Sequence, residues 1–147
     1  MITIKKLAMQ LCLSSAVIAA MPATFAAETA QSHAQHYMVK NVNIGDLPVK
    51  TIVPITAKTA EQALAQAKVI ASNPDADLAE FRIDLLEFSA DTKKVIALGQ
   101  QLNQILKDKP LIATIRTHNE GGKMTVSDQD YEKIYREYLK KPFMQLL

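Results

Sequence analysis

The regular spacing of strand-like apolar segments is the feature that constrains this chain most. Four such segments begin at positions 51, 78, 111 and 143, and a helix-like segment lies in each interval between them. Alternation of this kind predicts right-handed βαβ units and a parallel sheet. Its spacing also fits the roughly 31 residues per unit of an eight-fold α/β barrel. The expected strands are 51–55, 78–84, 111–116 and 143–147.

The three expected helices have recognisable starts. Thr59 predicts the N-cap of a helix over 60–72. A second helix is expected over 92–106. Ser127 predicts the N-cap of a third helix, which runs to about residue 139. Before the first strand, the segment 38–50 alternates weakly and contains Gly45-Asp46, which predicts an N-terminal hairpin or cap that turns at those residues.

The first 26 residues have the pattern of a secretory signal peptide. Lys5 and Lys6 form a basic start, residues 7–20 are mostly apolar, and a small-x-small cleavage site ends at Ala26. The apolar run is shorter than the roughly 20 residues of a membrane span. We therefore expect an exported, periplasmic protein without a membrane anchor after cleavage, with residues 27–37 as a flexible leader.

Removal of this signal changes what the composition implies. The chain has 17 basic and 15 acidic residues, but Lys5 and Lys6 lie in the signal, so the mature chain has no formal net charge. Such a balance gives no electrostatic footprint for nucleic acid or anionic lipid. The only cysteine, Cys12, also lies in the signal, so no disulfide is expected. His33 and His36 lack a third ligand, so no metal site is expected.

The strand over 78–84, LAEFRID, decides between an open sheet and a barrel. Its apolar odd positions face one way, and Glu80, Arg82 and Asp84 face the other. Helices cover both faces of an open parallel sheet, where three charges on one face would be very costly. No glycine-rich turn follows the strand over 51–55, which argues against a dinucleotide-binding sheet. The pattern favours an α/β fold that is the first half of a (β/α)8 barrel, interrupted in its fourth strand.

The next strand repeats this arrangement and adds a second arginine. Thr114 and Arg116 share one face, so Glu80, Arg82 and Arg116 are expected to face one space near the rim of the barrel. A structural ion pair of Glu80 with one arginine is one interpretation. The favoured interpretation is a site for a small anionic metabolite, because two arginines against one glutamate leave positive charge for a carboxylate or phosphate.

The loop after Arg116 carries His118, Glu120 and two adjacent glycines, which allow a tight path close to a ligand. Glu120 is either an acid that orients a catalytic base or a solvated loop residue. His118 has polar neighbours and is expected to point to solvent. Lys58 and Lys123 lie just beyond strand ends. A desolvated lysine can form a Schiff base, but nothing in the sequence buries these two, and we expect them to be exposed.

The segments DLAEFRID and KPLIATIRTHNEGG resemble type I 3-dehydroquinate dehydratase, whose hallmarks read E-(W/F)-R-x-D and then (T/F)-x-R-x-x-x-E-G-G. The similarity runs from about Met38 through Leu147, so 38–147 is expected to be the N-terminal part of such a barrel domain. The resemblance implies a (β/α)8 barrel, often a homodimer, that removes water from 3-dehydroquinate. The family works through an imine between a lysine and the substrate ketone. A histidine serves as base and acid, and no metal or organic cofactor takes part.

Matched by position, the resemblance also implies roles for individual residues. Glu80 and Arg82 contact ring hydroxyls of the substrate, Arg116 helps to hold it, and Glu120 supports the catalytic histidine. Where many members have a serine in the first strand, this chain has Pro54, which removes one possible polar contact.

The resemblance does not supply the nucleophile. The family's catalytic histidine and imine-forming lysine lie on later strands, and no Lys or His here matches them. We therefore expect a fragment or a truncated gene product that is poorly soluble and inactive alone. An exported member suggests quinate or shikimate breakdown. The alternative is a non-catalytic periplasmic module, derived from the barrel, that binds small anions or mediates an interaction.

Overall fold

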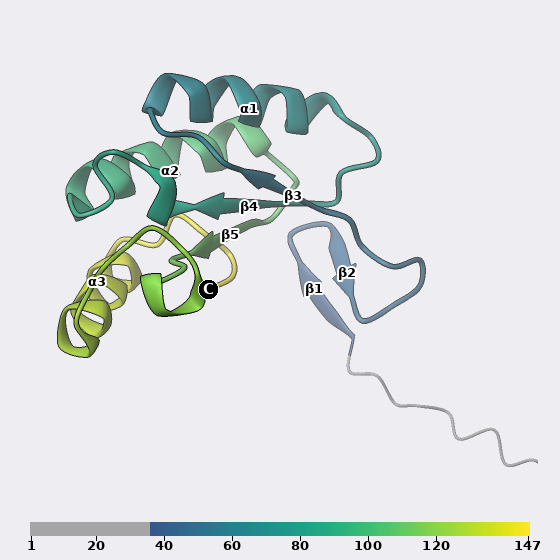
Figure 1. Ribbon diagram of the computed structural model, residues 1–147. Coiled ribbons are helices and arrows are strands. Elements are labelled where there is room, and N and C mark those ends of the chain that lie inside the picture. Colours follow the sequence, from purple (N-terminus) through teal and green to yellow (C-terminus); the bar gives the residue numbers. More distant parts are fainter. Residues whose placement is uncertain (1–35) are drawn as a thin grey trace, which may run out of the picture. The chain divides into compact units, whose positions relative to one another are not determined.

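The computed structural model describes residues 36–147 (Figure 1). The expected signal peptide over 1–26 and nearly all of the expected leader over 27–37 lie outside the described residues. The elements are β1 (Tyr37–Val39), β2 (Val42–Ile44), β3 (Ile52–Ile55), α1 (Ala60–Ser72), β4 (Leu78–Arg82), η1 (Ile83–Leu85), α2 (Thr92–Leu106), β5 (Leu111–Thr114), η2 (His118–Glu120) and α3 (Asp128–Lys140). Across 36–147, no helix combines the length and the apolar character needed to cross a membrane.

A parallel sheet in the strand order β3-β4-β5 carries the fold. Ile52 of β3 pairs with Leu78 of β4, and Phe81 of β4 pairs with Ala113 of β5. A helix joins each strand to the next, so strands that follow each other in the sequence are also neighbours in the sheet. This is the arrangement of successive βα units in a barrel.

The helices start where their capping residues predict. Thr59 Oγ1 accepts the backbone N–H of Gln62 at 3.3 Å at the start of α1. Ser127 Oγ accepts the backbone N–H of Asp130 at 3.2 Å at the start of α3. These bonds satisfy N–H groups that have no partner inside the helix. The helix α2 occupies the predicted range, Thr92–Leu106.

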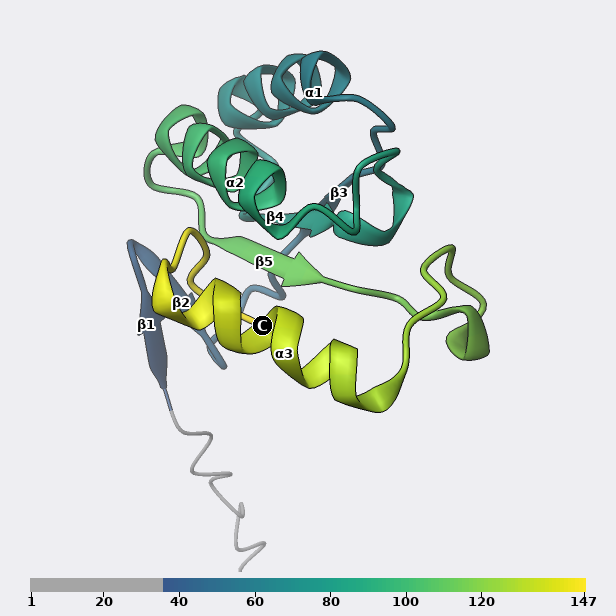
Figure 2. The same cartoon turned by 90° about the vertical axis from the view of Figure 1, so that its left-hand side faces the viewer.

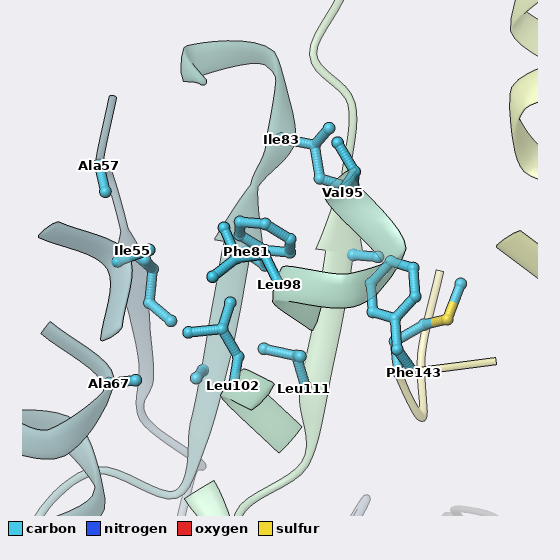
Figure 3. Packing of buried hydrophobic residues seen from close by; sticks show 14 of the residues in the cluster. Ile55, Ala57, Ala67, Phe81, Ile83, Val95, Leu98, Leu102, Leu111 and Phe143 are labelled. Atoms are coloured by element: carbon cyan, nitrogen blue, oxygen red, sulfur yellow. The ribbon is translucent and has the colours of Figure 1, made fainter. Parts of the chain in front are cut away.

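One face of the sheet holds the core (Figure 3). Ile55, Phe81 and Leu111, one from each strand, are fully buried and lie in one cluster with Ala67 of α1 and Leu102 of α2. The two helices lie side by side over this face in both views (Figures 1 and 2). Burial of each large apolar side chain contributes about 1.5–3 kcal/mol, so this helix-covered face supplies most of the hydrophobic stabilisation.

The third helix belongs to the same face. The ring of Tyr138 in α3 lies 5.4 Å from that of Phe143, which in turn lies 6.4 Å from the ring of Phe81. On the opposite face Pro54 is exposed and Glu80 is only half-buried. Helices on one face of a sequentially ordered parallel sheet are typical of a barrel, because a doubly wound sheet has helices on both faces.

The hairpin of β1 and β2 was predicted, but the position of its turn was wrong. Val39 pairs with Val42, so the chain reverses at Lys40-Asn41 and not at Gly45-Asp46. Lys40 has a φ of 50° in this turn, a left-handed conformation that residues other than glycine seldom adopt. A search for glycine could not locate this turn, because the residue with the positive φ is a lysine. Its side chain makes long-range contacts that the local sequence does not reveal.

That contact anchors the hairpin to the N-terminal end of the sheet. Lys40 Nζ donates to Asn103 Oδ1 at 2.8 Å and to the carbonyl oxygens of Lys107 and Lys109 at 2.6 and 3.0 Å. Carbonyls beyond the end of α2 lack helical partners and favour a cation. Lys109 Nζ donates in turn to the carbonyl of Asn73 at 2.8 Å. The two lysines therefore connect the hairpin with the segments that lead into β4 and β5.

The expected fourth strand over 143–147 is only partly formed. Its contact with β5 is a single parallel bridge between Ile112 and Leu146, in which the N–H of Ala113 donates to the Leu146 carbonyl at 2.9 Å. The side chain of Gln145 accepts the N–H of Leu111 at 3.0 Å. The direction and neighbour of this segment agree with a fourth barrel strand, but among the described residues nothing pairs with its outer edge.

Candidate active site

Polar side chains gather where β4 and β5 end. The last residues of these strands, Arg82 and Thr114, are paired in the register. Both strands stop earlier than the sequence predicts, and the short helical turn over 83–85 begins directly after Arg82. Asp84 is therefore not a strand residue whose side chain parallels that of Arg82. The turn folds it back toward the guanidinium.

Arg82 and Asp84 form a bidentate ion pair. Arg82 Nε donates to Asp84 Oδ1 and Arg82 Nη2 donates to Asp84 Oδ2, each at 2.9 Å. The side chain of Asp84 is 0% exposed and that of Arg82 is 17% exposed. A planar fork held at two points fixes the orientation of the guanidinium as well as its position.

This pair corrects the charge balance expected from the sequence. That expectation set two arginines against Glu80 alone and left open an ion pair between Glu80 and either arginine. No such pair occurs among the salt bridges within 36–147, where Asp84 is the partner of Arg82. Arg116 is then the guanidinium without a carboxylate partner in the described region. The spacing of Arg82 and Asp84 could have revealed the pair, had the strand been predicted to end earlier.

Asp84 also holds the loop that follows β5. Its Oδ1 accepts the backbone N–H of Arg116 at 3.4 Å, and its Oδ2 accepts the backbone N–H of Lys123 at 3.2 Å. Burial raises the pKa of Asp84, but the hydrogen bonds from Arg82, Lys123 and Arg116 outweigh burial and leave the pKa below its ordinary value. Asp84 is therefore ionised at neutral pH.

Residues 117–124 form a closed loop on which the two glycines act differently. A bridge joins Thr117 to Met124, and the N–H of Gly122 donates to the Thr117 carbonyl at 2.8 Å. Gly121 has a φ of 81°, and a Cβ on Gly122 would lie 1.9 Å from the carbonyl oxygen of Arg116. The predicted tight path exists, and the structure shows that it is tight against the backbone of Arg116.

The loop places Glu120 beside Arg116. Arg116 Nε donates to the carbonyl oxygen of Glu120 at 2.7 Å. The Glu120 carboxylate accepts the backbone N–H and the hydroxyl of Thr117, both at 2.9 Å. These two bonds, the backbone one first, hold the pKa of Glu120 below its ordinary value, and Arg116 adds to the effect. Both side chains are exposed and can be approached from solvent.

The remaining candidates are exposed, as predicted. Lys58 and Lys123 are solvent-accessible, so neither of these two amines is buried as an imine-forming lysine would be, and His118 is exposed as well. In the portion of the chain that the structure describes, no group of three or more His, Cys, Asp or Glu residues is placed to hold a metal ion.

The sequential strand order, the helices on one face and the polar C-terminal edge define a sector of an α/β barrel of the TIM type. The sequence profile described as Type I 3-dehydroquinase matches residues 51–146. The chain belongs to the type I 3-dehydroquinase family, as the segments over 77–84 and 109–122 predicted.

Two curated relatives define how much of the family's length is present. The chain is 79% identical over 125 residues to the catabolic 3-dehydroquinate dehydratase of Acinetobacter baylyi, covering 84% of this chain and 46% of that protein. It is 44% identical over 110 residues to the 3-dehydroquinate dehydratase of Enterococcus faecalis, covering 75% and 43%. The chain therefore spans less than half the length of these relatives.

Solved structures confirm the expected fold class. The chain matches the 3-dehydroquinate dehydratase of Enterococcus faecalis with a TM-score of 0.68 at 45% identity, over 71% of this chain and 43% of that one. It matches the type I 3-dehydroquinate dehydratase of Clostridium difficile, solved with covalently modified comenic acid, with a TM-score of 0.70 at 28% identity, over 74% and 42%. The likeness covers part of the barrel.

Proposed function

We propose that this chain forms the substrate-binding part of a lyase that dehydrates 3-dehydroquinate to 3-dehydroshikimate. One observation supports this most. At the strand end where barrels carry their chemistry, Arg82 is fixed by Asp84 and Arg116 has no carboxylate partner in the described region. One oriented guanidinium and one available guanidinium suit a small substrate that bears a carboxylate and several hydroxyls.

The proposed roles follow the family pattern. Glu80 and Arg82 contact ring hydroxyls, and Arg116 helps to hold the substrate. Glu120 supports a catalytic histidine. Its carboxylate is compatible with this role because the lowered pKa keeps it ionised at neutral pH, so it can accept a hydrogen bond from an imidazole.

The proposed chemistry passes through an imine. A lysine amine adds to the substrate ketone and water leaves. A histidine then removes a proton beside the imine, and the ring hydroxyl departs as water. Hydrolysis releases the product and restores the amine. In the family both residues lie on later strands, and the exposed Lys58, Lys123 and His118 do not match them. We therefore propose that the chain alone has no turnover.

A catabolic role is part of the proposal. The relative from Acinetobacter baylyi, at 79% identity, is named as a catabolic enzyme, and the pattern of residues 1–26 is that of an export signal. A periplasmic dehydratase would act in quinate or shikimate breakdown. Fractionation of cells expressing the chain tests this, because retention of the uncleaved chain in the cytoplasm would contradict export.

The activity can be tested in a hybrid protein. In it, residues 38–146 of this chain replace the matching segment of the Acinetobacter baylyi relative, which supplies the later strands. We expect the hybrid to dehydrate 3-dehydroquinate and to be inactivated by borohydride only when substrate is present. Mass spectrometry should then find the reduced adduct on a lysine. A folded hybrid that binds substrate without turnover would instead favour the non-catalytic anion-binding module.

Variants of the hybrid test the assigned residues. Arg116→Gln should raise KM about tenfold to a hundredfold, because a charge-assisted hydrogen bond is lost. Glu120→Gln should lower kcat more than it raises KM and should shift the pH profile. Arg136→Gln is the matched control, since this arginine lies on α3 in an exposed pair with Glu132. Equal kinetics of Arg116→Gln and Arg136→Gln would contradict the assignment.

A further inference from the structure

Asp84 has a place in the structure that the proposed function does not explain. It is the one charged residue among 36–147 that is buried, with 3% of its surface exposed. Removal of a carboxylate from water is expensive unless opposite charge and hydrogen bonds compensate. Replacement of a buried ion pair by apolar side chains is often neutral or stabilising, so stability alone does not account for this one.

Each of the two carboxylate oxygens of Asp84 accepts one hydrogen bond from Arg82 and one from a backbone N–H of the loop after β5. Oδ1 accepts from Arg82 Nε and from the backbone N–H of Arg116. Oδ2 accepts from Arg82 Nη2 and from the backbone N–H of Lys123. Each oxygen thus joins the guanidinium of β4 to one end of the loop after β5. Any movement of Arg82 acts on both ends of that loop.

We propose that Asp84 is a positioning residue that sets Arg82 and the loop carrying Arg116 and Glu120 as a single unit before substrate binds. This inference rests on the proposed function, and it assigns to Asp84 a role in substrate affinity without direct contact with substrate. The orientation leaves Arg82 Nη1 without a bond to Asp84, and the proposal assigns this nitrogen to the substrate.

Contacts within the loop hold its residues together, so that the loop is oriented as one piece. Arg116 Nε is bonded to the Glu120 carbonyl, and the Glu120 carboxylate is bonded to Thr117. Gly122 packs against the backbone of Arg116 so closely that a Cβ would not fit. Since the loop is closed on itself by these contacts, the two N–H groups held by Asp84 fix its whole orientation relative to β4.

Hydrogen exchange of the full chain in dilute solution tests the physical link. Asp84→Asn keeps the shape but removes the charge, so exchange of the amides over 116–124 should accelerate about tenfold to a hundredfold, because charge-assisted hydrogen bonds are lost. Asp77→Asn is the matched control, since Asp77 Oδ2 also accepts a backbone N–H, that of Thr51 directly before β3, at 2.8 Å. Unchanged exchange over 116–124 in Asp84→Asn would overturn the proposal.

Kinetics of the hybrid distinguish a positioning role from a merely structural one. Asp84→Asn should raise KM about tenfold, with a smaller effect on kcat. In an Arg82→Gln background the same substitution should raise KM much less, because its action passes partly through Arg82. Equal effects in both backgrounds would overturn the proposal.

A second variant covers a failure of Asp84→Asn to fold. Arg82→Lys leaves a cation beside Asp84 but removes the two-point clamp, so it should still accelerate exchange over 116–124 and raise KM. An unchanged loop and an unchanged KM in this variant would overturn the positioning role. If the hybrid with native Asp84 has no turnover, the proposed function fails, while the exchange experiment still decides whether the link exists.

Discussion

The two ends of the sheet are each held by one charged side chain, but with different partners. At the N-terminal end, Lys40 Nζ donates to an amide oxygen and two backbone carbonyls, all neutral acceptors. At the C-terminal end, Asp84 accepts from a guanidinium and two backbone N–H groups. Burial lowers the pKa of Lys40, which disfavours its charged form, although Asp108 opposes this effect. The pKa of Asp84 is also lowered, but for a carboxyl group this favours the charged form.

This difference distinguishes a side chain that only stabilises the fold from one that also orients a charged group. Neutral carbonyls accept a cation in many geometries, so Lys40 attaches the hairpin to the sheet without fixing the orientation of a charged group. A bidentate pair has one geometry. At the C-terminal end of the sheet, where barrels perform their chemistry, the charged group of Arg82 is therefore both paired and fixed in orientation.

The largest expected effect is that of removing the carboxylate. Asp84→Ala leaves the guanidinium of Arg82 mostly buried and unpaired, which should lower the free energy of unfolding by about 3–5 kcal/mol. Urea unfolding of the hybrid measures it. Comparable losses in Asp84→Ala and Lys40→Met would abolish the distinction between the two ends.

Lowering the pH should remove part of the stabilisation that Asp84 provides, because it protonates this carboxylate. The folded-state pKa of Asp84 is lower than the ordinary value of 3.8. Its contribution is therefore fully present above about pH 4 and disappears as pH falls through the folded-state pKa. The stability difference between the native hybrid and Asp84→Asn should shrink on acidification below pH 4. A difference that stays constant over that range would contradict the depressed pKa.

Gly122→Ala should disrupt the C-terminal end without changing any charge. The new Cβ would lie 1.9 Å from the Arg116 carbonyl oxygen, and relief of such overlap costs about 1–3 kcal/mol. Gly121→Ala is the control: its Cβ has room, and only the positive φ costs about 1 kcal/mol. Urea midpoints of the two variants should differ in this order, and loop exchange should accelerate more in Gly122→Ala.

Lys40→Met should have the smallest effect. Methionine keeps the apolar stem, and the three acceptors that lose the ammonium are neutral and lie in exposed or only partly buried bonds, so the expected loss is about 1 kcal/mol. The substitution should also leave the KM of the hybrid unchanged. A rise in KM would show that the hairpin end influences the site and would remove the contrast between the two ends.

Local signals made the helices and strands predictable. Thr59 and Ser127 cap their helices through bonds to residues three positions away, and such bonds depend on sequence alone. The strand over 143–147 depends on neighbours on both sides, and with one neighbour described it forms a single bridge. Short-range patterns therefore predicted elements better than they predicted pairing.

The candidate site was predictable as a set of residues but not as a geometry. Glu80, Arg82, Arg116 and Glu120 do lie at or near the C-terminal ends of neighbouring strands. The partnership with Asp84 was missed because a period of two treats Arg82 and Asp84 as parallel side chains. The short helical turn after Arg82 breaks that period and brings them together.

The closed neck of the 117–124 loop has a practical consequence. Because Thr117 and Met124 are bridged and the backbone N–H of His118 donates to the Met124 carbonyl at 2.8 Å, a change of an exposed side chain on this loop leaves the backbone bonds of the neck in place. The sequence contains no tryptophan, and the side chain of His118, next to the neck, is exposed. A single indole introduced by His118→Trp would thus be an isolated fluorophore close to Arg116, and its emission would report the arrival of an anion in real time.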